Sequence, residues 1–142
     1  MIIDNNLVLS SNQAITATAD STNVIDLGAP GTPFGAPVAV EQDIGKANRI
    51  AIAVNVTQAF NNLTSLAVSL QVSADNSTYK EVATHTYLLA DINAVKQLDF
   101  PAQLPVGTNL RYMKLTYTVT GTAPTTGQIF AAIVAARQNN NH

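Results

Sequence analysis

The side chains that could carry acid–base or metal chemistry are few in this sequence. The chain contains two histidines, His85 and His142, and no cysteine. Nucleophilic catalysis needs a nucleophile beside a base, usually histidine, and a zinc site needs three or four nitrogen or sulfur ligands. His142 is the last residue, and His85 alternates with Ala83 and Tyr87 in a strand-like run, where we expect a half-buried structural histidine. We therefore predict that the protein is not an enzyme and needs no metal and no cofactor.

Carboxylates offer a second route to a site, because nine acidic residues occur in the chain. The segments Asp75-Asn76-Ser77 and Asp91-Ile92-Asn93 resemble fragments of a calcium-binding loop. Neither segment continues to the glycine and the distal glutamate that an EF-hand loop requires. We expect both aspartates to stabilise turns.

The composition favours contact with other proteins over contact with nucleic acid or lipid. Charged residues make up 11% of the 142 residues and hydrophobic residues 46%, whereas globular domains average roughly 25% charged residues. Short uncharged side chains suit surfaces that another protein covers, because few charges then lose their water. The seven basic residues are scattered, so we predict no nucleic-acid partner. No apolar run is long enough to cross a bilayer, and no basic region precedes the short apolar run at the start, so we expect neither a membrane span nor a secretory signal.

Apolar residues recur at every second position in several runs, which is the pattern of half-buried strands. In Arg49–Thr57 one face is apolar and branched, whereas the other face is small and includes Ala51 and Ala53. The predicted strands are Leu7–Leu9, Ile15–Ala19, Asn23–Leu27, Pro37–Val40, Arg49–Thr57, Ser65–Ser73, Tyr79–Leu89, Val95–Phe100, Leu110–Thr120 and Gln128–Arg137.

Turn-forming residues lie between these runs. Ala74–Ser77 predicts a hairpin turn, and Gly121–Gly127 predicts a longer loop that closes the last hairpin. Leu27–Pro37 contains three prolines and three glycines, so we expect a long surface loop there. A short helical turn is expected at Ala90–Ala94. The sequence therefore predicts one all-β domain over residues 1–142, built as an antiparallel two-sheet sandwich of jelly-roll or Ig-like topology, with a closed barrel as the alternative.

The segment Ile129–Ala136 has no polar side chain on either face. We expect one face to pack into the core. The other face is covered either by the chain's own loops and terminal segment or by a second copy across a symmetry axis, and we hypothesise the second copy. Small residues such as Ala131 and Ala135 would let the two backbones approach closely.

Two further segments are candidates for contact with a partner. Phe34, in the Pro/Gly-rich loop, either folds back under the loop or is presented to a partner. In the N-terminal segment, residues 1–9, the apolar start pairs either within its own sheet or with a neighbouring molecule, and Asp4-Asn5-Asn6 is expected to form a loop. The candidate interface residues are Met1, Ile2, Ile3, Phe34, Ala131 and Ala135.

Three long stretches of the sequence resemble one protein family. The opening MIIDNNLVLSSNQAITATADSTNVIDLG, the hairpin LAVSLQVSADNSTYKEVAT and the closing LRYMKLTYTVTGTAPTTGQIFAAIVAAR are similar to the jelly-roll cement (decoration) proteins of tailed bacteriophage heads. The resemblance implies a jelly-roll fold and a structural virion protein, made in the host cytoplasm, that binds the outer surface of the capsid. It would bridge subunits of the major capsid protein and stabilise the expanded shell. It would form a homo-oligomer, for which we favour a homodimer over a homotrimer.

Two other functions remain as alternatives. The first is a carbohydrate- or receptor-binding β-sandwich of the tail-fibre or lectin type, which predicts a groove lined by clustered aromatic side chains. The second is a small barrel that carries an apolar ligand, which predicts an interior cavity.

Overall fold

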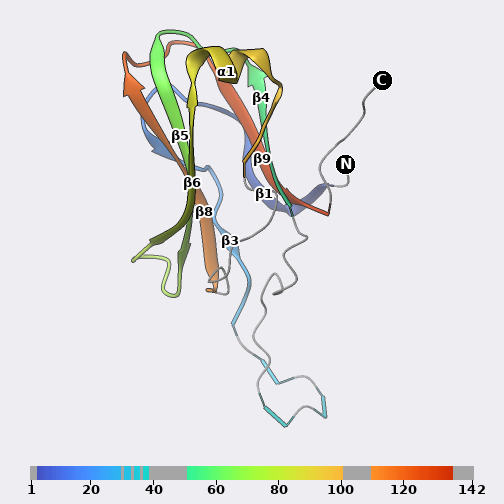
Figure 1. Ribbon diagram of the computed structural model, residues 1–142. Coiled ribbons are helices and arrows are strands. Elements are labelled where there is room, and N and C mark those ends of the chain that lie inside the picture. Colours follow the sequence, from blue (N-terminus) through green and yellow to red (C-terminus); the bar gives the residue numbers. More distant parts are fainter. Residues whose placement is uncertain are drawn as a thin grey trace.

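Two antiparallel sheets packed face to face make up the fold (Figure 1). The computed structural model describes residues 3–29, 31–32, 34–35, 37–38, 51–100 and 110–135. The elements are β1 (Ile3–Ala14), β2 (Ala19–Asp20), β3 (Ile25–Asp26), β4 (Ala51–Gln58), β5 (Leu63–Ser73), β6 (Lys80–Leu88), α1 (Leu89–Ala94), β7 (Gln97–Leu98), β8 (Tyr112–Gly121) and β9 (Gln128–Val134).

The order of the strands is that of a jelly roll. One sheet has the order β1-β9-β4-β7, and the other has the order β2-β8-β5-β6, with β3 also paired to β8. The short strands β2 and β3 therefore share one edge of the second sheet. Among the described strands, the chain changes sheet at every step except within that edge and at the β5–β6 hairpin, which is the jelly-roll connectivity. The prediction of an all-β two-sheet sandwich is confirmed.

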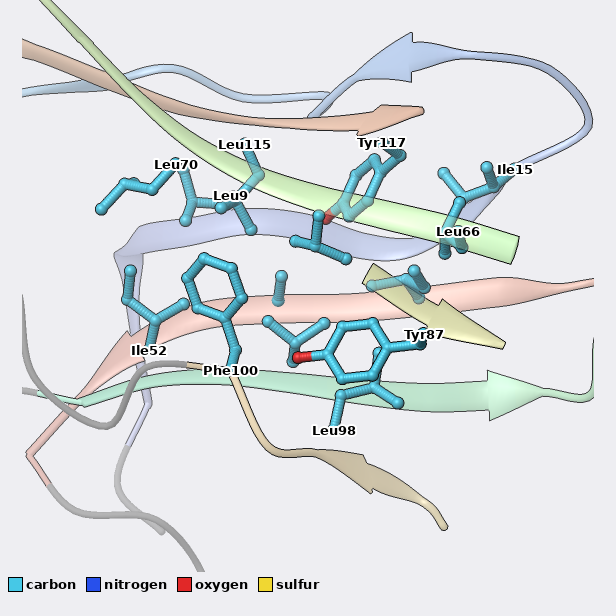
Figure 2. Packing of buried hydrophobic residues seen from close by; sticks show 14 of the residues in the cluster. Leu9, Ile15, Ile52, Leu66, Leu70, Tyr87, Leu98, Phe100, Leu115 and Tyr117 are labelled. Carbon is cyan, nitrogen blue, oxygen red and sulfur yellow. The ribbon is translucent and has the colours of Figure 1, made fainter. Parts of the chain in front are cut away.

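The core lies between the sheets and is built by the predicted alternation. In β5 the even-numbered residues Leu66, Val68, Leu70 and Val72 are fully buried, since successive side chains in a strand point to opposite faces. Figure 2 shows the side chains of the two sheets meeting between the ribbons. The residues labelled there are Leu9, Ile15, Ile52, Leu66, Leu70, Tyr87, Leu98, Phe100, Leu115 and Tyr117.

One buried hydrogen bond joins the two sheets through this core. The hydroxyl of Tyr117 in β8 lies 2.8 Å from Oγ of Ser10 in β1, and Ser10 Oγ itself donates to Oε1 of Gln13 at 2.8 Å. Because the single hydroxyl proton of Ser10 is used by Gln13, Tyr117 is the donor to Ser10. Burial raises the pKa of Tyr117, so its hydroxyl keeps the proton that it donates.

Removing the hydroxyl of Ser10 or that of Tyr117 should destabilise the fold, and the two losses of stability should differ. Ser10→Ala leaves the buried Tyr117 hydroxyl without its acceptor and should cost about 1–3 kcal/mol. Tyr117→Phe removes the donor but leaves the bond from Ser10 to Gln13 intact. This substitution should therefore cost about 1 kcal/mol. Urea unfolding of both variants measures the difference, and a Tyr117→Phe variant less stable than Ser10→Ala would contradict this assignment of donor and acceptor.

The predicted hairpin turn at Ala74–Ser77 is confirmed and is organised by Asp75. Its Oδ1 accepts the backbone N–H groups of Ser77 at 2.9 Å and Thr78 at 2.8 Å. It also accepts the hydroxyl of Ser73 at 2.8 Å. Asn76 has a φ of 58°, a left-handed conformation that asparagine tolerates in turns. These donors favour the charged carboxylate, led by the Thr78 N–H, and lower the pKa of Asp75 from 3.8 to about 2.

This lowered pKa makes the turn sensitive to acid. A carboxylate whose pKa is lower in the folded state stabilises the fold above its ordinary pKa, and this contribution is lost as the pH falls through the folded value. Asp75→Asn should therefore lower the urea midpoint at neutral pH, and the difference from the wild type should shrink between pH 3.8 and about 2. Urea titrations of both proteins across this range provide the check. The other carboxylates are common to both proteins, so a difference independent of pH would contradict the role given to the Asp75 charge.

The prediction that Gly121–Gly127 closes a hairpin is wrong, because β8 and β9 lie in different sheets. The loop instead crosses between the sheets at one end of the sandwich, where Oδ1 of Asn61 accepts the backbone N–H groups of Thr125 and Thr126. Gly127 has a φ of 139°. A Cβ there would lie 2.2 Å from the Phe60 ring, so the crossing needs glycine at this point.

The start of the chain also differs from the prediction. Asp4-Asn5-Asn6 belongs to β1, which runs from Ile3 to Ala14. The pairing with β9 is irregular between Ile3 and Val8, and the N–H of Asn6 bonds to Oδ1 of Asp4 at 2.9 Å. A local turn-like bond is thus accommodated inside a bulged strand.

Two further element predictions have clear outcomes. The strand predicted at Ile15–Ala19 is wrong, because only Ala19–Asp20 pairs, as β2. The predicted helical turn is confirmed as α1.

Candidate interaction surface

The histidine predicted to be half-buried lies on the surface. His85 is exposed on β6, and its ring centroid lies 4.5 Å from that of Tyr87. The reason is that β6 is an edge strand of its sheet, so a side chain on its core-facing side reaches solvent. Within the described residues, no group of three or more potential metal ligands comes together. No helix in that part of the chain has the length and hydropathy needed to cross a membrane.

The two calcium-loop fragments are structural. Asp75 organises the hairpin turn, as predicted. Asp91 lies in the first turn of α1 instead of in a loop turn. Asn93 binds both backbone groups of Phe60: its Nδ2 donates to the carbonyl and its Oδ1 accepts the N–H, each at 2.9 Å. The second fragment therefore connects α1 to the β4–β5 connection.

Part of the outer surface of the β2-β8-β5-β6 sheet carries uncharged side chains, most of them short, and we name this part the hydroxyl face. Its residues form three rows across β8, β5 and β6: Thr116, Ser69 and Thr84; Thr118, Ala67 and Thr86; Thr120, Ser65 and Leu88. These residues alternate with the buried core residues of the same strands, so they point away from the core.

Small residues in the central strand of the hydroxyl face lie below the threonines on either side. Ser69 is 5% exposed, and its hydroxyl lies 2.8 Å from that of Thr84. Thr86 and Thr118 are exposed on the flanking strands. Charge borders the face at one corner, where Asp20 of β2 pairs with Thr116, accepts its hydroxyl at 2.7 Å and accepts from the Lys114 ammonium at 2.6 Å. In the next row Gln71 pairs with Lys114 on one side and with Glu81 on the other. Away from the corner at Thr116, the hydroxyl face can therefore contact another protein without stripping water from a charge.

The outer surface of the other sheet is apolar but already buried. On β9 the residues Ala132 and Val134 point away from the core and are 0% and 1% exposed. They form a second apolar cluster, the outer cluster, against which Phe130 packs. Its members are Val8, Ala51, Ala53, Ala132 and Val134. The single chain thus shields this face, and the hypothesis that a second copy is needed to cover it is not supported.

The candidate interface residues of the sequence do not gather on one surface. Ala131 is fully buried in the core between the sheets, so its side chain is not available to a partner. Ala135 is exposed just after β9. Ile3 is 42% exposed and pairs with Val134 of its own sheet. Met1 and Ile2 lie outside the described residues.

The structure decides between the two alternatives predicted for Phe34. Its exposed fraction is 109%, so it does not fold back under its loop but is presented to solvent.

Sequence reasoning missed both the hydroxyl face and the outer cluster as units. The signals were present: small residues at alternate positions of β4 and β5, and threonines at alternate positions of β8. What the sequence lacks is the register that sets Thr116 and Thr84 on either side of Ser69.

A comparison with models of protein families identifies the family of this chain. A family model described as Bbp16 matches residues 9–134. The chain belongs to the Bbp16 family. The match begins within β1 and ends at the last residue of β9, so membership in the Bbp16 family covers both sheets of the sandwich. A search of curated proteins found no match.

Proposed function

We propose that this member of the Bbp16 family is a structural virion protein, a capsid cement (decoration) protein of a tailed bacteriophage. It binds the outer surface of the head and bridges neighbouring subunits of the major capsid protein, which stabilises the expanded shell. It is made in the host cytoplasm and acts as a homo-oligomer, with a homodimer favoured.

The hydroxyl face is the observation that carries this proposal. A cement protein must cover a repeating protein surface without a covalent bond and stay bound. Threonine and serine side chains supply hydrogen-bonding groups, and small side chains let a partner's backbone approach closely. Uncharged side chains also avoid the large cost of dehydrating charges. Several copies that act together then multiply weak contacts into strong attachment.

The carbohydrate-binding alternative has less support. Sugar sites commonly use an open aromatic ring as a platform. In the part of the chain that the structure describes, the two tyrosines that are not buried in the core, Tyr79 and Tyr112, are each contacted by a cation. The Lys114 ammonium lies 4.0 Å from the Tyr79 ring centroid, and the Arg111 guanidinium lies 4.9 Å from that of Tyr112.

Binding to the capsid tests the proposal. The protein should co-sediment with empty expanded heads built from the major capsid protein of the same phage. Binding should change little between low salt and about 0.5 M salt, because the residues of the hydroxyl face carry no charge and Asp20 at its border is paired with Lys114. Thr118→Glu should weaken binding at least about tenfold, since a carboxylate covered by protein loses its hydration without gaining a partner.

The matched control is Thr57→Glu, which places the same charge on an exposed position of β4 in the other sheet. It should bind heads as the wild type does. Wild-type protein that does not bind heads would overturn the proposed function. Glycan-array binding by the wild type would favour the carbohydrate-binding alternative instead.

A further inference from the structure

The described residues that follow β3 lie beyond the end of the sandwich opposite α1. Figure 1 shows its described residues, coloured light blue to cyan, well away from both sheets. We name residues 28–38 the arm. Phe34 is 109% exposed and Val38 is 69% exposed, so the described apolar side chains of the arm are presented to solvent, an unfavourable state for a phenyl ring in a free protein.

The base of the arm is fixed by a network of bonds. Arg111 donates from Nε and Nη2 to both carboxylate oxygens of Asp26, at 2.7 and 2.9 Å. The N–H of Gly28 bonds to Asp26 Oδ1 at 2.9 Å, and the N–H of Leu27 bonds to the carbonyl of Arg111 at 2.8 Å. These bonds hold the backbone in place at Leu27 and Gly28, where the arm begins, so this part of the chain need not be ordered when the arm docks.

The amino-acid composition of the arm favours binding to an apolar pocket on another protein. No charged residue occurs between Leu27 and Val40, and prolines stand at positions 30, 33 and 37. Proline restricts the backbone before binding, and proline-rich segments dock in apolar grooves of proteins. The absence of basic residues in this stretch of sequence gives the arm no attraction for phosphate groups of lipids or nucleic acids.

The described surface of the chain does not supply such a receptor for a second copy. Apart from the arm, its exposed large hydrophobic side chains are Ile3, Val24, Leu88 and Val95. They lie at the start of β1, beside β3, and on either side of α1. Neither hydrophobic cluster includes any of them, whereas a phenyl ring needs a contiguous apolar pocket.

We propose that the arm is an anchor whose Phe34 side chain inserts into an apolar pocket of the major capsid protein. This inference rests on the proposed function and assigns it a binding element distinct from the hydroxyl face. The sandwich provides the rigid body, and the Asp26–Arg111 pair holds the base of the arm against it. Phe34 provides the apolar surface that becomes buried on docking.

The test compares Phe34→Ala with Val95→Ala, which truncates an exposed apolar residue directly after α1, the helix at the opposite end of the sandwich. The affinity of each protein for empty expanded heads is measured by co-sedimentation, and the melting temperature of each free protein is recorded. Phe34→Ala should bind at least about 30-fold more weakly, the effect expected for an aromatic residue that dominates an interface. Val95→Ala should bind within about twofold of the wild type. Neither melting temperature should change, because both side chains are exposed.

The outcomes separate the inference from the proposed function. Wild-type protein that fails to bind heads overturns both. Wild-type binding that Phe34→Ala leaves intact overturns the anchor alone. A lower melting temperature for Phe34→Ala would show that the ring packs on its own chain, and self-association of the free wild type that is lost in Phe34→Ala would show that its receptor is a second copy. Either result overturns the assignment to the capsid protein.

Discussion

The burial of β9 on both of its faces is the constraint on which the rest of the structure depends. The side chains of Ile129 and Ile133 enter the core between the sheets, whereas Ala132 and Val134 on the opposite face join the outer cluster. A strand covered on both sides must be apolar throughout, which explains why Ile129–Val134 has no polar residue. It also lies inside its sheet, because β9 pairs with β1 on one side and with β4 on the other.

The outer surfaces of the two sheets therefore have different roles. The outer side of the β9 sheet is closed by the single chain and contributes to folding, as the full burial of Ala53 and Ala132 shows. The outer side of the other sheet stays open and carries the hydroxyl face. The projecting arm adds an apolar tip at one end. Contact surfaces of these two kinds, one broad and uncharged and one small and aromatic, are complementary means of attachment for a protein proposed to hold other proteins together.

Local alternation predicted the sheets well, but the long-range arrangement came only from the structure. The period-two pattern located β4, β5, β8 and β9, and Asp75 marked the β5–β6 hairpin, since both signals are local. The pairing of β8 and β9 with distant strands carries no local signal, so the crossing at Gly127 was predicted as a hairpin. Burial was harder still, because His85 is exposed through the edge position of β6, which depends on the topology.

The central claim, that one chain closes the outer face of β9, is tested most directly by the unfolding of Ala132→Glu. The account predicts a loss of at least about 3 kcal/mol that is independent of protein concentration, because an unpaired charge is buried inside the folded chain. Ala135→Glu, at an exposed position, should stay within about 0.5 kcal/mol of the wild type. An Ala132→Glu protein that is as stable as the wild type but no longer self-associates would contradict the claim, since the face would then be an interface between copies.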